Sequence, residues 1–289
     1  MSSIEVDAHF HVWELERFKY PWPNDSVAPI YKTITFPDLT LALNSANVKN
    51  AVFIQCLNDC PEEAIWVMES RHPAIKGVVA GVTLEDHHKL ELQLDMLCKY
   101  PEFVGVRHIL DMEASNDWII GQDVIEGLKI VAARGKTFDF EFARPHHLQH
   151  VATVAKAVPN LKIVIDHVAK PVFLEGLDPA WKRNMEMAAL CPNVFCKISG
   201  LVTEVDPDHH KISWDTRTFS EHVKCVLHLF GSDRCMIGSD WPVLGLAGAD
   251  YKKVNSLHKE LLGHLSEKER MEVLGGTATV FYQLKDLGS

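Results

Sequence analysis

The chain alternates between short apolar runs and longer amphipathic segments, and this alternation constrains its fold more than any other feature. Eight apolar runs are predicted to be strands: residues 5–9, 51–55, 77–82, 104–108, 137–142, 162–166, 194–198 and 235–238. Helical patterns follow at residues 37–45, 61–70, 88–98, 122–133, 146–157, 181–189, 219–229 and 250–262, with two more at 266–275 and 277–284. Strands that are apolar on both faces and alternate with helices predict a parallel sheet.

Eight such units in 289 residues favour a closed (β/α)8 barrel, a TIM-like α/β fold, over an open doubly wound sheet. An open sheet that bound a nucleotide would have a glycine-rich turn after its first strand. Here the first strand runs into His-Phe-His-Val-Trp, which contains no glycine. No linker rich in Gly and Ser and no block of like charges divides the sequence, so residues 1–289 are predicted to form one domain.

Charge and composition exclude several classes of partner. The formal net charge of −10 argues against nucleic acid and anionic membrane surfaces. No segment approaches the ~18–20 consecutive apolar residues of a membrane span, and the first residues do not resemble a secretory signal. The seven cysteines are odd in number and form no zinc-knuckle pattern, so reduced, mostly buried thiols are expected. These features predict a cytoplasmic protein with a small-molecule partner and leave a homo-oligomer open.

The first predicted strand carries two histidines, His9 and His11, two residues apart. Alternate side chains of a strand share a face, so both imidazoles are predicted on one face with Asp7 behind them, and the apolar residues, Ala8 and Phe10 among them, on the other. Two such rings can grip a metal ion or a substrate oxygen, or they can be hydrogen-bonded core histidines. The pair alone leaves both interpretations open.

Polar residues also end most of the other predicted strands. In a (β/α)8 barrel the C-terminal ends of the strands meet at one mouth, where active sites lie. Ionisable and amide side chains would be costly to bury at that mouth without a function. The residues at these strand ends are Gln55, Arg107, His108, Asp166, His167, Lys197, Ser199, Asp240 and Trp241. Together with the histidine pair they predict the active site of an enzyme.

This set of motifs resembles the amidohydrolase superfamily and, more narrowly, its amidohydrolase-2 group of lactonases, which includes fuconolactonase, rhamnonolactonase and pyrone-dicarboxylate lactonase types. The matching stretches cover nearly the whole chain in order: Asp7-Ala8-His9-Phe10-His11-Val12-Trp13, Tyr20-Pro21-Trp22-Pro23, Gly105-Val106-Arg107-His108, Arg144-Pro145-His146-His147-Leu148, Asp166-His167-Val168-Ala169-Lys170-Pro171, Cys196-Lys197-Ile198-Ser199-Gly200-Leu201-Val202-Thr203-Glu204 and Gly238-Ser239-Asp240-Trp241-Pro242. The resemblance implies a hydrolase of carbohydrate metabolism with His9, His11, His167 and Asp240 as its catalytic set.

One departure from the superfamily bears on the metal. Its binuclear members carry a bridging carboxylated Lys on the fourth strand and a His on the fifth. This chain has Arg107-His108 at the first place and no histidine at the end of the fifth predicted strand. A two-metal site is therefore not expected. The resemblance implies one divalent metal held by the four catalytic residues, Zn²⁺ before other ions, or no metal at all, and no organic cofactor.

Hydrolysis of a lactone needs an activated water, a polarised carbonyl and a proton for the leaving alkoxide. Asp240 is predicted to deprotonate the water and return the proton. The three histidines are predicted to polarise the carbonyl directly or through the metal. The planar fork of Arg107 suits a carboxylate or neighbouring hydroxyls. The further candidates for substrate binding are His108, Gln55, Lys197 and Trp241.

The long segment at residues 13–36 contains several prolines and aromatic residues and is predicted to form a rim or lid over the active site. Few cations stand at the predicted mouth, which favours a neutral sugar-acid (aldono) lactone over a dicarboxylate substrate.

Three alternative functions use the same barrel. A metal-dependent nonoxidative decarboxylase would share the histidines and the aspartate. An amidase or phosphoesterase is disfavoured because the bridging Lys is missing. A barrel that only binds its ligand would be expected to lack part of the catalytic set, which is complete here.

Overall fold

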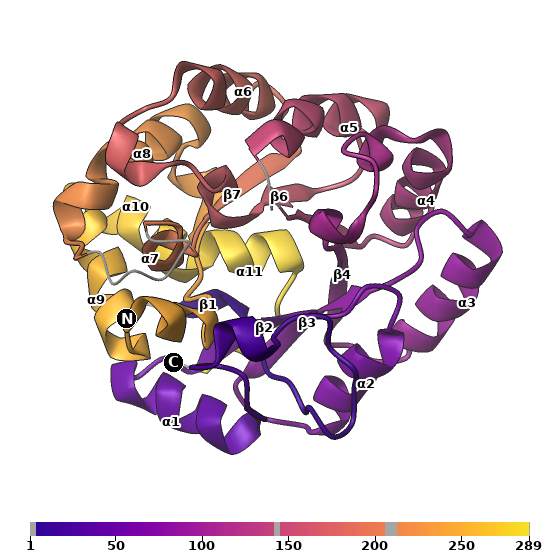
Figure 1. Cartoon of the computed structure of the whole chain (residues 1–289). Helices are drawn as coiled ribbons and strands as arrows, with labels where there is room; N and C mark the ends of the chain where they lie inside the picture. The colour runs from indigo at the N-terminus through magenta and orange to yellow at the C-terminus, as the bar shows by residue number, and fades with distance from the viewer. Residues whose placement is uncertain (1–3, 142–144, 206–212, 289) are drawn as a thin grey trace.

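The computed structural model describes residues 4–141, 145–205 and 213–288, and these form the (β/α)8 barrel that the sequence predicts. Eight parallel strands pair in chain order: β1 Val6–Phe10, β2 Asn50–Ile54, β3 Ile75–Gly81, β4 Phe103–His108, β5 Thr137–Phe140, β6 Ile163–Ile165, β7 Val194–Ile198 and β8 Cys235–Ile237. A bridge between Phe10 and Trp241 brings the residues after β8 back against β1 and closes the ring (Figure 1).

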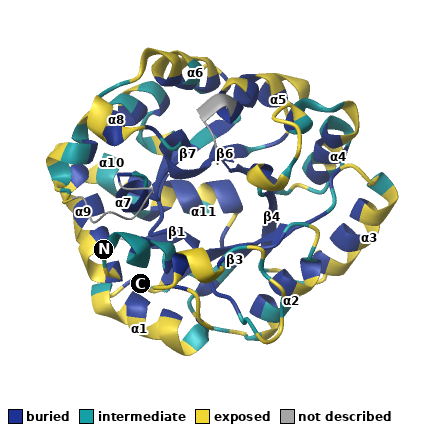
Figure 2. Ribbon diagram, viewed as in Figure 1, coloured by how far each residue is buried: buried dark blue, intermediate teal, exposed yellow. Residues whose placement is uncertain are grey.

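Most of the helices surround this ring, and the C-terminal helix is the exception. The helices are α1 Phe36–Ala46, α2 Pro61–Glu69, α3 His87–Leu97, α4 Gln122–Ala133, α5 Val151–Ala157, α6 Pro179–Ala189, α7 Leu201–Glu204, α8 Thr216–Phe230, α9 Tyr251–Leu261, α10 Glu267–Met271 and α11 Thr277–Tyr282. Figure 2 shows their buried faces turned toward the strands and their exposed faces turned outward. The chain is thus a single α/β barrel, as predicted.

Most boundaries differ from the sequence prediction by one to three residues, and two predicted helices also differ in type over part of their length. The predicted helix at 146–157 is regular only over α5, because residues Pro145–His150 form a 3-10 helix. The predicted helix at 266–275 is α10 followed by a π-helical turn, Glu272–Gly276. Gly275 lies so close to the backbone before β1 that a Cβ there would come within 2.2 Å of the Ile4 carbonyl oxygen. The end of the predicted strand at 137–142 includes Phe142, which lies outside the described residues.

The core has two parts. The larger lies between the sheet and the outer helices and includes Phe10, Phe53 and Phe138. The smaller joins the inward residues Val52 and Val164 to the C-terminal helix α11 through Ala278, Phe281 and Tyr282. In Figure 1 α11 lies at the centre of the ring of strands. The amino-terminal end of the barrel is therefore filled, and the carboxyl ends of the strands form the mouth.

Strand β1 contains an extra residue that changes the predicted face of Asp7. Its pairing with β2 advances from Asp7 to Phe10 while β2 advances only from Ala51 to Phe53, which is a β-bulge. Asp7 and Phe10 therefore both face the helices, whereas Ala8 and His9 face the barrel interior. The prediction that Asp7 lies behind His9 on one face is wrong, and so is the shared face of Ala8 and Phe10.

Asp7 instead connects the first and last strands of the barrel through hydrogen bonds. Its carboxylate accepts hydrogen bonds from the Ser239 N–H (2.8 Å), the Ser239 hydroxyl (2.6 Å) and the Tyr251 hydroxyl of α9 (3.0 Å). The N–H of His9 donates to the same carboxylate at 3.2 Å. The backbone that carries His9 is thereby held beside the backbone that leads into Asp240.

Candidate active site

A cavity of about 370 Å³ opens at the carboxyl ends of the strands. His11, Arg107, His167 and Asp240 line it, and they come from β1, β4, β6 and β8 or from the turns directly after them. Residues far apart in the sequence thus share one mouth, as the barrel topology predicts.

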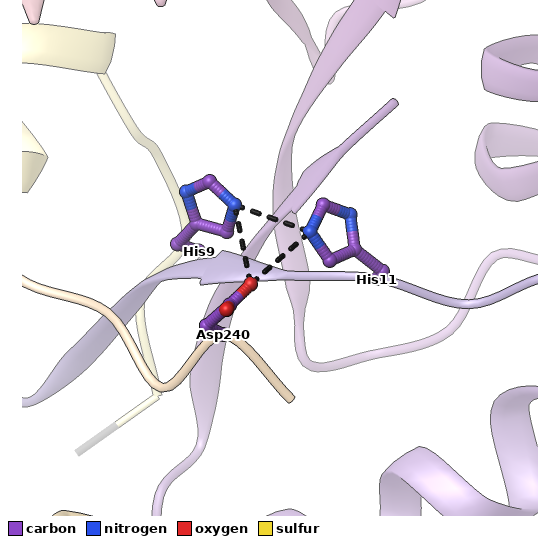
Figure 3. A group of neighbouring side chains, drawn as sticks. All are labelled: His9, His11 and Asp240. Carbon is purple, nitrogen blue, oxygen red and sulfur yellow. Dashed lines mark hydrogen bonds and ion pairs between the residues drawn. The ribbon is translucent and has the colours of Figure 1, made fainter. Parts of the chain in front are cut away.

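The centre of the site is formed by His9, His11 and Asp240 (Figure 3). The Nε2 atoms of the two histidines lie 3.2 Å apart. Asp240 Oδ1 lies 3.4 Å from His11 Nε2 and 3.7 Å from His9 Nε2. All three residues are buried. Asp240 has a left-handed backbone (φ 57°), which points its carboxylate at the pair.

The surroundings of His11 fix which of its nitrogens faces the centre as an acceptor. A backbone carbonyl can only accept, so Nδ1 of His11 carries the proton that it donates to the Ile54 carbonyl at 2.8 Å. Nε2 of His11 then presents a lone pair toward the carboxylate of Asp240. Two acceptors that face each other across a buried gap need a proton or a cation between them.

The donor set therefore fits a divalent ion. Two imidazole nitrogens and one carboxylate oxygen are ligands that Zn²⁺ prefers, and a carbonyl or carboxylate beyond the ring orients such histidines. His9 also belongs to a second group of close donors with Asp166 and His167, and within each group the donor atoms lie within 4.8 Å of one another. His9 is common to both groups, so all four residues of the predicted catalytic set lie around one place.

Burial keeps His9 and His167 neutral. It lowers the pKa of His9 well below its ordinary value and that of His167 to about 4. Burial alone would raise the pKa of Asp240, but His167 and His11 outweigh it and hold that pKa well below its usual range. At neutral pH the site thus offers the neutral imidazoles of His9 and His167 beside the ionised carboxylate of Asp240, which is the state that binds a metal ion.

His167 stands in an unusual turn. Four consecutive residues, from His167 to Lys170, have positive φ between 46° and 59°, and one of them is the β-branched Val168. Each such residue costs roughly 1–2 kcal/mol, and backbone strain of this kind concentrates at functional sites. The His167 ring is held by the Ser199 hydroxyl at 2.9 Å from Nδ1. Gly200 packs against it so closely that a Cβ would lie 2.6 Å from Nδ1.

Beneath the centre lies a buried network of charges. Lys197 is fully buried, and its ammonium donates to Asp139 and lies 3.0 Å from Asp166 and 3.2 Å from His9 Nδ1. Burial opposes ionisation of Asp166, yet Lys197 and His9 hold its pKa well below the ordinary value. Tyr282 of α11 donates to Asp139 at 2.7 Å. The network therefore links the C-terminal helix to His9.

Of the predicted substrate contacts, Arg107 lines the cavity. It donates to the Gln55 carbonyl at 2.6 Å and to Asp166 at 3.3 Å. Gln55 is fully buried and returns a bond from Nε2 to the Arg107 carbonyl at 3.2 Å, so it holds Arg107 in place. Lys197 lies below the floor of the cavity.

His108 and Trp241 are not among the described residues that line the cavity. The His108 ring stacks on Trp118 and bonds Glu113 at 2.7 Å. Trp241 packs with the aromatic residues of the rim and receives the His11 N–H on its carbonyl at 2.7 Å. Their substrate roles stay predictions.

Four charged residues that sequence reasoning did not select line the cavity, and three of them, Glu141, Lys170 and Glu204, come from the units of β5, β6 and β7, whereas the fourth is Asp111. A signal existed for Lys170 and Glu204. Lys170 lies within the Asp166–Pro171 motif and Glu204 ends the Cys196–Glu204 motif, so both stand in stretches that match the resembled family. All three lie beyond the last paired residue of their strand, where strand periodicity no longer predicts direction.

The predicted rim segment, residues 13–36, reaches the cavity through Trp22 and Val27. A bridge between Trp13 and Ile34 pairs its two ends. Trp13 is fully buried, and its ring meets Trp22 edge-on with centroids 6.0 Å apart. The segment is therefore packed onto the barrel beside the mouth.

Glu63 supports the wall formed by Cys56 and gives a prediction about pH. It is fully buried, and its Oε2 accepts the N–H groups of Cys56 (2.8 Å) and Leu57 (3.3 Å). Burial raises the pKa of Glu63 from 4.5 to about 7. Between these values the folded chain holds a proton that the unfolded chain releases, so the free energy of unfolding falls as pH rises through this window.

The side chain of the Glu63→Gln variant cannot ionise, so the variant is expected not to show this loss. The difference in free energy of unfolding between variant and wild type should therefore shift in favour of the variant by roughly 1–3 kcal/mol between pH 5 and pH 8. Urea unfolding at the two pH values measures the difference. Glu62→Gln, an exposed change in the same helical turn, is the control and should show little pH-dependent change. Equal pH dependence of Glu63→Gln and wild type would contradict the assignment.

Among the described residues, no helix combines the length and the apolar character needed to cross a membrane.

Comparison with known proteins agrees with the geometry of the site. The amidohydrolase (Amidohydro_2) family model matches residues 6–284. The chain is 32% identical over 287 residues to an L-fucono-1,5-lactonase of Burkholderia ambifaria, covering 98% of this chain and 96% of the relative. It is 36% identical over 108 residues to an L-rhamnono-gamma-lactonase of Scheffersomyces stipitis, covering 32% of this chain and 31% of the relative. The structure of an amidohydrolase from Burkholderia multivorans with bound Zn superposes with a TM-score of 0.86 at 27% identity, over 98% of this chain and 100% of that one.

Proposed function

Because the chain belongs to the amidohydrolase (Amidohydro_2) family and is a hydrolase, we propose that it opens the ring of a sugar-acid (aldono) lactone. The observation that carries this proposal is the convergence of His9, His11 and Asp240, with His167 beside them, at the floor of the cavity. The similarity to lactonases over nearly the full chain supports the same substrate class.

Asp240 is the general base in this proposal. It turns Oδ1 to the two histidines, so its second carboxylate oxygen can accept a proton from a water molecule. The hydroxide attacks the lactone carbonyl and forms a tetrahedral intermediate. Collapse of this intermediate breaks the bond to the ring oxygen, and protonated Asp240 returns its proton to the leaving alkoxide. The product is the open hydroxy acid.

The three histidines stabilise the charge that develops on the carbonyl oxygen. A divalent ion, Zn²⁺ by the chemistry of the donors, would supply Lewis-acid polarisation when held by His9, His11, His167 and Asp240. The hydrogen bond to the Ile54 carbonyl keeps His11 in the tautomer that faces the substrate. The Ser199 hydroxyl holds the ring of His167 in the same way.

Arg107 is proposed to bind the substrate next to the reacting carbonyl. Its pairing with Asp166 and with the Gln55 carbonyl fixes the plane of the guanidinium at the cavity wall. Residues 13–36 are proposed to act as the rim that covers the bound lactone, with Trp22 and Val27 in contact with it.

A turnover and metal experiment tests the proposal. Purified protein is expected to release acid from aldonolactones such as L-fucono-1,5-lactone, followed with a pH indicator. Removal of metal by chelation is expected to lower kcat by about 10²–10³, the cost of losing carbonyl polarisation, and added Zn²⁺ should restore it. Metal content before and after chelation is measured on the same samples.

Two results would count against parts of the proposal. No acid release across an aldonolactone panel, with CO2 release from aromatic acids instead, would replace lactonase by decarboxylase. Full lactonase activity in protein shown to be free of metal would leave the histidines to polarise the carbonyl directly.

A further inference from the structure

We propose that Glu141, Lys170 and Glu204 form a subsite that binds the ring hydroxyls of the substrate, which makes the enzyme selective for a neutral, polyhydroxylated lactone. This inference rests on the proposed function and adds the residues that choose the substrate. None of the three belongs to the set that acts on the carbonyl.

The three residues come from successive units of the barrel and meet at one wall of the cavity. Glu141 follows β5, Lys170 ends the left-handed turn after β6, and Glu204 ends α7 after β7. Lys170 Nζ lies 3.4 Å from Glu141 Oε1 and 3.8 Å from Glu204 Oε1. The turn that carries His167 also carries Lys170, so one strained segment serves both the reacting centre and this wall.

The long separations leave these groups with hydrogen-bonding capacity for a ligand. A closed ion pair between an ammonium and a carboxylate has an N–O distance of about 2.7–2.9 Å, and both contacts of Lys170 are longer. The side chains of Lys170 and Glu204 keep 23% and 21% of their exposure, and Glu141 keeps 8%. Charged groups that are nearly buried yet loosely paired retain donors and acceptors for a polar ligand.

The order of hydrogen-bond acceptors and donors along this wall suits the hydroxyl groups of a ligand. A carboxylate only accepts hydrogen bonds and an ammonium only donates them, whereas a hydroxyl does both. The wall presents acceptor, donor and acceptor in sequence, so neighbouring hydroxyls of a sugar ring can donate to Glu141 or Glu204 and accept from Lys170. A ligand carboxylate would instead face two like charges beside a single ammonium.

The charge of the described part of the cavity lining points the same way. Its described lining residues include four carboxylates, Asp111, Glu141, Glu204 and Asp240, and two cationic side chains, Arg107 and Lys170. Arg107 is already paired with Asp166. Such a lining repels a dianion and accepts a neutral ligand that can donate several hydrogen bonds.

The test compares two lactones that differ only in hydroxyls: an aldono-1,5-lactone of a pentonic acid and δ-valerolactone. Glu204→Gln and Lys170→Met are each expected to lower kcat/KM for the aldonolactone by about 10- to 100-fold, the effect of losing a hydrogen bond to a charged group. For δ-valerolactone the change should stay within about twofold, because that ring has no hydroxyl to lose. Equal losses on both lactones, or no loss on either, would overturn the subsite.

Matched controls and a binding measurement keep this result separate from the proposed function. Glu91→Gln and Lys156→Met are the same changes at exposed helix positions, and they should alter neither lactone's hydrolysis. Calorimetry with the aldono-1,5-lactam and with 2-piperidone requires no turnover. If the wild type hydrolyses no lactone, the proposed function fails. The subsite then stands if the hydroxylated lactam binds at least about tenfold more tightly and Glu204→Gln abolishes the difference, and it falls if the two lactams bind equally.

Discussion

Asp240→Asn is expected to lower kcat on the lactone by about 10²–10⁴-fold, because the amide cannot take a proton from water. The fold should survive the change. Asn is nearly isosteric with Asp and tolerates the left-handed backbone that residue 240 adopts, at φ 57°. Steady-state kinetics on the aldonolactone, with circular dichroism and thermal unfolding of the same preparation, measures both effects.

Asp286→Asn provides a matched control. Asp286 also has a left-handed backbone, at φ 52°, and is exposed near the C-terminus, where its carbonyl accepts a bond from Lys76 at the start of β3. The same chemical change there should leave kcat unchanged. Asp240→Asn with near wild-type kcat would show that another group activates the water.

Metal content separates the two roles that Asp240 can have. If Asp240→Asn retains its metal but loses turnover, the carboxylate acts as the base. If metal and turnover are lost together, the main contribution of Asp240 is as a metal ligand beside His9 and His11. The Nε2 atoms of both histidines lie close to its Oδ1 atom.

The barrel was predictable because its signal is repeated. Most strand residues are apolar and each strand is followed by a helix, so an error at one boundary does not change the topology. The structure brings His9, His11, His167 and Asp240 together as this topology predicts, since every parallel strand delivers its carboxyl end to one mouth.

Directions within a strand were less predictable, and β1 shows why. Alternation assigns faces only while the pairing register is constant, and the bulge between Asp7 and Phe10 adds a residue to β1 alone. His9 and His11 still face the same centre because the register shift in β1 comes before both of them. Asp7 precedes it and faces α9 instead.

The position of a side chain along the barrel axis could not be predicted from the sequence either. Lys197 and Arg107 both stand near strand ends, and both were candidate substrate contacts. In the structure Arg107 reaches the cavity whereas Lys197 is enclosed below it. Glu141, Lys170 and Glu204 belong to segments beyond the strands, whose direction depends on backbone angles such as the positive φ of Lys170.

Lys197→Met is expected to lower the free energy of unfolding by about 3–5 kcal/mol, the usual cost of removing one partner from a buried ion pair. Asp139 and Asp166 are both fully buried and both approach the Lys197 ammonium. Without it, two carboxylates remain in the interior with reduced compensation. Urea unfolding measures the loss, and Lys156→Met on the exposed face of α5 is the control for the substitution itself.

A second change identifies the cause of that loss. Adding Asp139→Asn to Lys197→Met removes one of the uncompensated charges while the amide can still accept the bond from the Tyr282 hydroxyl. The double variant should therefore be more stable than Lys197→Met alone, so that the two changes are not additive. If Lys197→Met instead unfolds like the wild type and only raises KM for the lactone, Lys197 contacts substrate as its position at a strand end suggested. The buried network would then not be what holds His9 and Asp166 in place.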